Sequence, residues 1–199
     1  MVYCVYMPIS ETARKIADTA QAILVSEGAR AVTMRRVADE VGVSPMATYK
    51  HYPNRDALLD AVAHRAFREL ADGWGRRCPD GPWADRLSGL MHDFLDFALG
   101  RPHLYTFLMT ERRERARRFP EDFAGGGSPA FTQVVALAEE GIRAGALRAD
   151  DPLEVALALT SPVQGLVQLY HGGRIGLDEA GFRRLCERTV RRVLDGVHV

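Results

Sequence analysis

The side chains best suited to catalysis or metal binding are scattered along the chain without a catalytic spacing. The six histidines form no His-Glu-x-x-His pattern, and none lies close in sequence to one of the three cysteines. His92 and Asp96 share a helical face at four-residue spacing, but two ligands do not make a metal site. No serine occupies a Gly-x-Ser-x-Gly turn. We therefore expect no catalytic residue, no metal and no cofactor.

A different arrangement occupies residues 33–51, where two short helices are predicted on either side of a tight turn. Thr33 is placed to cap the first helix, and Gly42 permits the positive φ that such a turn needs. A small residue at Ala38 lets the second helix approach, which is the spacing of a helix-turn-helix. In such a unit the second helix, here residues 45–51, enters the DNA major groove with its N-terminal residues leading.

The elements that must position this turn are all predicted to be helices. Six apolar residues at spacings of three and four indicate the first helix: Ala13, Ile16, Ala17, Ala20, Ile23 and Leu24. Ser10 is placed to cap that helix and Gly28 to end it, while Asn54 caps a later helix that runs to about Asp72. Further helical blocks are expected at residues 83–99, 102–119, 129–144, 152–171 and 178–197. Almost no stretch alternates with period two, so the predicted fold class is all-α.

On these residues the chain resembles the TetR family of bacterial transcription regulators. The matching positions are Ile23, Gly28, Thr33, Val37-Ala38, Val41-Gly42-Val43-Ser44, Tyr49, His51-Tyr52 and Arg55-Asp56-Ala57-Leu58-Leu59. Residues 140–147 also resemble a segment that commonly precedes the penultimate long helix of the family. The resemblance implies an N-terminal three-helix helix-turn-helix DNA-binding domain (residues 10–56) and a C-terminal helical ligand-binding and dimerisation domain (residues 57–199). Residues 1–9 are expected to be a disordered extension.

The resemblance also implies which residues contact DNA. Tyr49 and Arg55 would each hold a phosphate, and the backbone N–H groups near Thr33 and Met34 would bind a third. Arg35 and Lys50 are candidates for phosphate or base contact. The base contacts are expected from Ser44, Met46, Ala47 and Thr48, whose hydroxyl and methyl groups suit thymine methyl groups. Pro45 and His51 complete the predicted DNA-binding set.

The C-terminal half is expected to form a homodimer and to enclose an effector. Residues 152–172 and 178–197 are the predicted dimer interface, because the first of these helices is apolar around much of its circumference. In the family the region between this interface and the DNA-binding domain encloses a small-molecule pocket, here for an apolar or aromatic effector. The candidate ligand-binding residues are Trp83, Phe94, His103, Phe107, Leu108, Phe131, Gln164, Gln168 and His171.

Composition narrows the function further. Lys and Arg together number 26, as do Asp and Glu, so DNA binding must come from the placement of charge rather than from its total. Three unclustered cysteines, and no apolar run long enough to cross a membrane, predict a cytoplasmic protein without membrane contact. The predicted function is a ligand-responsive repressor that binds a pseudo-palindromic operator in double-stranded DNA. The alternatives are an architectural DNA-binding protein without an effector and a helical enzyme.

Overall fold

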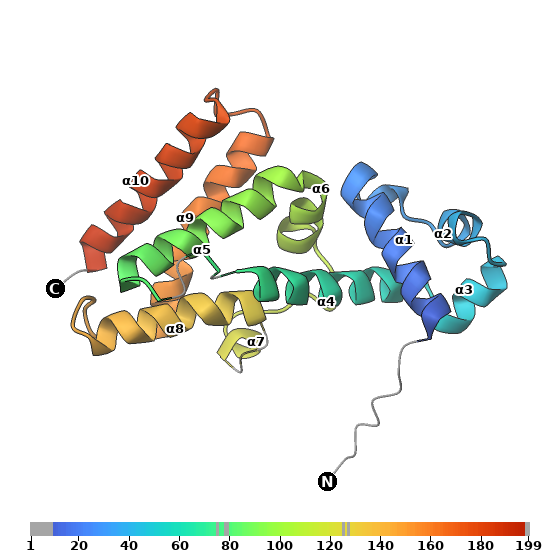
Figure 1. Cartoon of the computed structure of the whole chain (residues 1–199), viewed down its shortest axis with the longest axis horizontal. Coiled ribbons are helices and arrows are strands. Elements are labelled where there is room, and N and C mark those ends of the chain that lie inside the picture. Colours follow the sequence, from blue (N-terminus) through green and yellow to red (C-terminus); the bar gives the residue numbers. More distant parts are fainter. Residues whose placement is uncertain (1–9, 75, 78–79, 125, 127, 198–199) are drawn as a thin grey trace, which may run out of the picture. The chain divides into compact units, whose positions relative to one another are not determined.

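The computed structural model describes residues 10–74, 76–77, 80–124, 126 and 128–197, and every regular element in these ranges is a helix (Figure 1). The predicted N-terminal extension, residues 1–9, lies outside the described residues. The described chain divides into two compact units, each treated by itself below. Unit 1 runs to Ala66 and includes His103–Glu111, and unit 2 comprises Phe67–Pro102 and the chain from Arg112 onward. The division between the two units lies inside the helix α4 (Arg55–Gly73).

Unit 1 is built around α1 (Glu11–Glu27), whose buried residues are the six apolar positions predicted from the sequence. The hydroxyl oxygen of Ser10 accepts a hydrogen bond from the N–H of Ala13, and Gly28 follows the helix with φ 89°, so both predicted ends are confirmed. Burying Ile16, Ile23 and Leu24 contributes about 1.5–3 kcal/mol for each side chain. The stripe faces the short helices that follow it: η1 (Ala29–Ala31, 3-10), α2 (Met34–Val41) and α3 (Pro45–His51).

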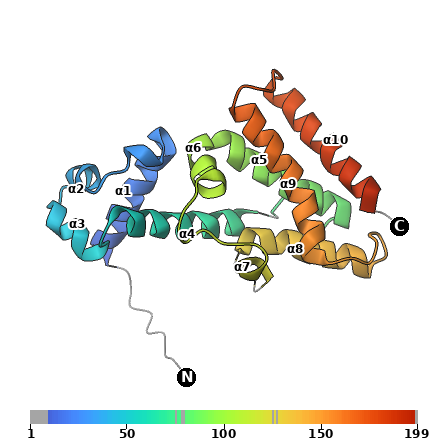
Figure 2. The same cartoon turned by 180° about the vertical axis from the view of Figure 1, so that it is seen from behind.

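Unit 2 contains the longer helices of the C-terminal half: α5 (Trp83–Gly100), α8 (Pro129–Arg143), α9 (Pro152–His171) and α10 (Glu179–Val197). Helix α9 packs against both α8 and α10, and α5 packs against α8. Figures 1 and 2 show α9 and α10 as neighbouring antiparallel helices joined by a short connection. Four of the predicted helical blocks are thus confirmed, with ends that differ by a residue at most.

The junction between α5 and α8 requires a glycine at position 141, within the segment 140–147 that resembles the family. A Cβ atom at Gly141 would lie 2.9 Å from the Trp83 ring and 2.9 Å from Leu147, so only glycine fits between them. The indole N–H of Trp83 donates to the backbone carbonyl of Leu137, and Arg86 pairs with Glu140 at 2.8 Å. These contacts hold the C-terminal end of α8 against the start of α5.

The prediction of one helix over residues 102–119 is wrong. The structure has a single turn, α6 (Pro102–Tyr105), followed by a π-helical turn, η2 (Thr106–Thr110), and then irregular backbone up to α7 (Glu121–Ala124). Residues 111–118 carry five arginines and no apolar side chain except Ala116, so they offer no stripe to bury.

Candidate functional site

The turn between α2 and α3 has the geometry that the sequence predicts. Gly42 adopts the left-handed conformation (φ 78°, ψ 33°), and its N–H donates to the carbonyl of Ala38 at 3.0 Å. Val37 and Ala38 are fully buried, whereas Val41 and Val43 are only half-buried. The oxygen of Ser44 caps α3 by accepting from the N–H of Ala47 at 3.2 Å. The angle between the two short helices is thus set by the turn between them, and both helices also pack against α1.

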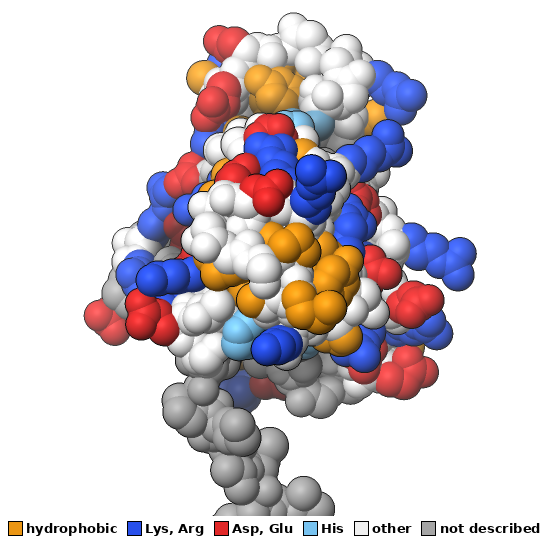
Figure 3. All heavy atoms as spheres, turned by 90° about the vertical axis from the view of Figure 1, so that its right-hand side faces the viewer, with side chains coloured by type: hydrophobic (Ala, Val, Ile, Leu, Met, Phe, Trp, Pro, Cys, Tyr) orange, Lys and Arg blue, Asp and Glu red, His pale blue; other side chains and the backbone are white. Residues whose placement is uncertain are grey.

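Helix α3 presents most of its side chains to solvent. Met46 is 69% exposed and Tyr49 is 47% exposed, and both are among the few large apolar or aromatic side chains that the described chain leaves exposed. Lys50 and His51 are exposed at the C-terminal end of the same helix. Figure 3 looks on to the end of unit 1 that carries α2 and α3, where hydrophobic side chains gather beside Lys and Arg side chains. Such a surface offers apolar contact and hydrogen-bond donors together.

The N-terminus of α2 lies next in the chain. Thr33 is exposed, and its hydroxyl oxygen accepts from the N–H of Arg36 at 3.2 Å. The N–H groups that precede Arg36 have no intrahelical acceptor, as at the start of any α-helix. Arg35 is exposed, with its guanidinium 3.9 Å from Asp39. The side chain of Met34 is buried, so only its backbone could meet a phosphate.

Two predicted DNA-contact residues occupy positions that sequence reasoning did not foresee. Thr48 is completely buried, and its hydroxyl oxygen has no hydrogen-bond partner among the residues that the structure describes, so this side chain faces the interior. Arg55 donates from Nε to the carbonyl of Val32 at 2.7 Å and from Nη2 to the carbonyl of Ala29. Its guanidinium therefore ties the start of α4 to the connection that leads into α2.

Two further residues hold the helix-turn-helix in place: Tyr52, one of the positions that match the family pattern, and Arg65, which lies outside that pattern. The phenol of Tyr52 donates to the carbonyl of Ala13 at 3.1 Å, and burial raises the pKa of this phenol. Arg65 of α4 donates to Asp18 and to Gln21 of α1. Because these contacts join residues 39 to 47 positions apart, no local spacing predicts them.

The nine predicted ligand-binding residues are not brought together in one described cavity. His103, Phe107 and Leu108 belong to unit 1, and the other six belong to unit 2. Within unit 2, Phe94 meets Trp74 edge to face, Phe131 meets Phe123 in the same way, and Trp83 packs at Gly141. The imidazole Nε2 of His171 lies 3.0 Å from the carbonyl of Ala98. Gln164 is half-buried and Gln168 is exposed.

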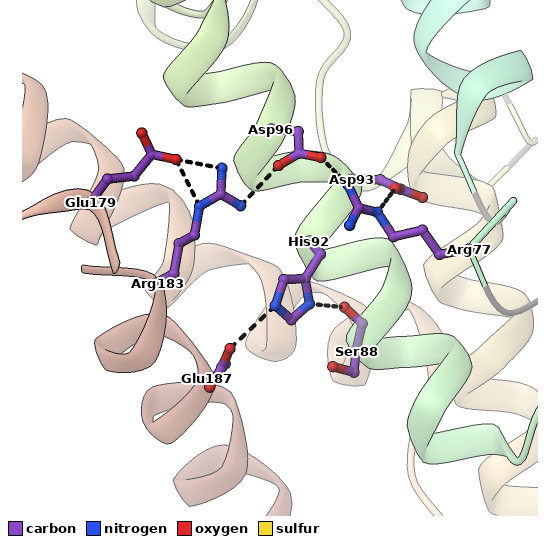
Figure 4. Close-up of polar contacts among 8 residues, drawn as sticks. All are labelled: Arg77, Ser88, His92, Asp93, Asp96, Glu179, Arg183 and Glu187. Carbon is purple, nitrogen blue, oxygen red and sulfur yellow. Dashed lines mark hydrogen bonds and ion pairs between the residues drawn. The ribbon is translucent and has the colours of Figure 1, made fainter. Parts of the chain in front are cut away.

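A pocket of about 350 Å³ in unit 2 lies elsewhere, where the end of α4 faces α5. None of the nine predicted residues lines it. Its lining residues are Glu69, Leu70, Gly73, Trp74, Asp93, Asp96, Phe97 and Arg101. Figure 4 shows the polar network beside it, in which Arg77 contacts Asp93 and Asp96, and Asp96 also contacts Arg183 of α10. His92, which lies on α5 with Asp93 and Asp96, has its imidazole Nε2 3.2 Å from Glu187 of α10.

The face of α9 that turns away from the core carries three small residues and one leucine. Val155, Ala156, Leu159, Val163 and Val167 are buried. Ala158, Ser161, Gly165 and Leu169 are exposed at spacings of three and four. Helix α10 instead exposes arginines, among them Arg184, Arg188, Arg191 and Arg192. The exposed face with small residues therefore belongs to α9 and not to α10. Separately, no described helix is long and apolar enough to cross a membrane.

Comparisons with known proteins agree on one family. A profile described as "Bacterial regulatory proteins, tetR family" matches residues 16–62, and one described as "Tetracyclin repressor-like, C-terminal domain" matches residues 87–193, more than half of the chain. The chain is 27% identical over 186 residues to the HTH-type transcriptional repressor Rv1474c of Mycobacterium tuberculosis, covering 90% of this chain and 92% of that protein.

Two further similarities differ in what they cover. The chain is 29% identical over 102 residues to the HTH-type transcriptional repressor DrrR1 of Streptomyces coeruleorubidus, but the match spans only 51% of this chain and 36% of that repressor. A solved structure from Rhodococcus sp. RHA1, described as a protein with unknown function, has a TM-score of 0.78 at 22% identity and covers 100% of both chains. That likeness shows the fold.

Proposed function

Because the chain belongs to the TetR family of bacterial transcriptional regulators, we propose that it is a repressor that binds a pseudo-palindromic operator as a homodimer and is released by a small-molecule effector. The observation that carries the proposal is α3, a capped helix after a tight turn that buries only Thr48. Its exposed residues can enter a major groove without disturbing the core.

The proposed contacts follow the exposure of each side chain. Met46 and the methyl group of Ala47 would meet thymine methyl groups, with Ser44 and Pro45 at the leading end of α3. Tyr49, Lys50 and His51 would contact the backbone or flanking bases. The N-terminus of α2 at Thr33, with Arg35 beside it, would bind a phosphate through its N–H groups. Thr48 is not among the proposed DNA contacts, because its side chain is buried. Arg55 would support DNA binding indirectly, by hydrogen-bonding the backbone between α1 and α2.

A homodimer is proposed because one helix-turn-helix contacts few phosphates, and two half-sites must lie about 34–36 Å apart to be bound together. The small exposed residues of α9 support close packing against the same helix of a second copy. The arginines of α10 would lie at the rim of this interface, where like charges stay hydrated. The predicted interface over residues 152–172 and 178–197 is thereby narrowed to a centre on α9.

The first experiment is to incubate the purified protein with sheared DNA of the source genome and to sequence the fragments that it retains. An enriched pseudo-palindrome upstream of a few genes is the expected result. Broad retention without a shared site, lost at moderate salt, would instead indicate an architectural DNA-binding protein. Protein that retains nothing is unfolded, refolded without small molecules and tested again, and a second failure would refute the proposal.

The two lysines of the chain provide a matched test of the DNA-binding face. Lys50 is exposed on α3, whereas Lys15 is exposed on α1 and pairs with Glu11 at 2.9 Å. Lys50→Gln should reduce the slope of log affinity against log salt by about 1, because one phosphate contact is lost. Lys15→Gln removes the same charge and should leave the slope unchanged. Equal slopes for the two variants, measured by fluorescence anisotropy, would exclude a phosphate contact at Lys50.

A further inference from the structure

We propose that the pocket between α4 and α5 binds an organic cation, a guanidinium or amidinium group on a small aromatic body, that replaces Arg77 on Asp93 and Asp96. The inference rests on the proposed ligand response and names the class of effector. It narrows the apolar or aromatic effector expected from the sequence to one that also carries a positive charge.

The lining of the pocket combines acidic and apolar groups. Its volume of about 350 Å³ lies at the lower end of the range for small-molecule sites. Three carboxylates line it, on Glu69, Asp93 and Asp96, against the single guanidinium of Arg101. Trp74 and Phe97 supply the aromatic surface. Apolar walls with a few convergent charges are what hold and orient a small ligand.

The protein itself shows that the two aspartates accept a planar cation. Arg77 donates from Nε to Asp93 at 2.5 Å and from Nη2 to Asp96, so one guanidinium joins both carboxylates (Figure 4). The Asp93 side chain is only 11% exposed, whereas Arg77 is 46% exposed. A carboxylate with so little exposure favours a cationic partner, because removal from water disfavours its charged form unless an opposite charge compensates.

Arg77 can leave without unfolding a helix. It lies outside the helices, between the end of α4 at Gly73 and the start of α5 at Trp83. Its exposure lets the guanidinium exchange the two aspartates for water, while the aspartates stay fixed on α5. An incoming amidinium or guanidinium would make the same charge-assisted hydrogen bonds and add contact with the aromatic rings.

Asp96 also links the pocket to α10. The second oxygen of Asp96, Oδ1, lies 2.8 Å from Nη1 of Arg183, and Arg183 also pairs with Glu179 at 2.8 Å. A cation that takes the Arg77 position therefore shares a carboxylate with the helix next to α9. Differential contact of this kind is what allows a ligand to favour one conformation over another.

The test is calorimetric titration of the full-length protein, without DNA, with three probes of one shape. Benzamidine carries an amidinium, benzamide is neutral and benzoate is an anion. Saturable binding of benzamidine, with benzamide and benzoate at least about tenfold weaker, is the expected result. Equal binding of benzamide, or stronger binding of benzoate, would overturn the proposal, as would failure of benzamidine to bind.

Two pairs of variants locate the site. Arg77→Gln removes the internal competitor and should tighten benzamidine binding several-fold, whereas Arg76→Gln removes the same charge from its exposed neighbour and should change nothing. Asp93→Asn should weaken binding at least about tenfold, whereas Asp85→Asn, an exposed position in the first turn of α5, should not. Circular dichroism establishes that each variant is folded. Unchanged or weaker binding to the Arg77→Gln variant would contradict the competition on which the inference depends.

The two proposals fail in different experiments. A protein that retains its operator but does not bind benzamidine would refute the cation pocket and leave the repressor proposal intact. A protein that binds benzamidine through Asp93 but retains no DNA, even after refolding, would refute the repressor proposal instead. Benzamidine bound in the pocket should also release operator DNA, and release that persists in the Asp93→Asn variant would show that the ligand acts elsewhere.

Discussion

Two residues of the DNA-binding domain have side chains typical of DNA contacts but contribute to the fold instead. Thr48 has a hydroxyl suited to a base edge but is fully buried, and Arg55 has a guanidinium suited to a phosphate but is hydrogen-bonded to two backbone carbonyls. Their neighbours Met46 and Tyr49, in contrast, are well exposed. The proposed DNA-binding surface therefore consists of the α3 side chains that the fold leaves exposed.

The buried hydroxyl of Thr48 leads to a prediction about stability. Thr48→Val replaces a hydroxyl that lacks a hydrogen-bond partner with a methyl group of the same shape, so it should raise the free energy of unfolding by up to about 1 kcal/mol. Thr33→Val is the matched control, because it removes the cap of α2 and should lower stability by about 0.5–2 kcal/mol. Urea denaturation measures both. A Thr48→Val variant that is less stable, or that changes operator preference, would restore a polar role for Thr48.

Cys186 gives a prediction about reactivity. Burial, reinforced by the negative charge of Glu187, raises the pKa of the Cys186 thiol to about 11, so almost none of it is thiolate at pH 8. In a variant with Cys4→Ser and Cys78→Ser, the folded protein should react with a thiol reagent at least about tenfold more slowly than the unfolded protein. Labelling at equal rates would mean that α10 opens readily in solution.

The sequence pattern predicts the positions and ends of helices better than it predicts the contacts of single side chains. The stripe and both ends of α1 follow from short-range rules, since a 3.6-residue period, a serine cap and a glycine suffice. The prediction of a helix after η2 is wrong because residues 111–118 have only one apolar side chain, and a charged stretch without an apolar stripe gains nothing from packing as a helix. The pocket was missed because it forms where the end of one helix faces the side of another, and the burial of Thr48 depends on how α3 packs on α1 and α2. Such contacts leave no local signature.

The junction of α5 and α8 can be tested through its glycine. Gly141→Ala would force a Cβ atom to within 2.9 Å of the Trp83 ring and of Leu147, so it should cost about 1–3 kcal/mol despite the higher helix propensity of alanine. Gly100→Ala, at the end of α5, has nothing within 4 Å and should be neutral or slightly stabilising. Thermal denaturation compares the two. Similar melting temperatures would show that the Trp83 ring moves aside.

At the scale of the whole molecule, the proposed assembly depends on α9. One side of this helix packs against α8 and α10, and the other side presents small residues with no partner in the described chain. Gly165 on that side has nothing within 4 Å of a Cβ position. A second copy of α9 could approach closely here, and the two DNA-binding ends would then be joined in one particle.

The dimer prediction uses that open position. Gly165→Arg should convert the protein from dimer to monomer, because a charged side chain would be buried between two helices. Ala136→Arg places the same residue on an exposed position of α8 and should leave the dimer intact. Sedimentation velocity distinguishes the two masses. A Gly165→Arg variant that remains dimeric would move the interface away from α9.

Helix α3 has one more consequence, for how such a protein acquires new targets. Since Thr48 is its sole buried residue, changes at the other positions disturb little packing, and surface changes away from caps usually alter stability by less than about 0.5 kcal/mol. If α3 reads the operator as proposed, its sequence preference can change through single substitutions, each of which leaves a folded protein. The same freedom would let an engineer retarget the protein by randomising Met46, Ala47, Tyr49 and Lys50, with Ser44 and Thr48 held constant.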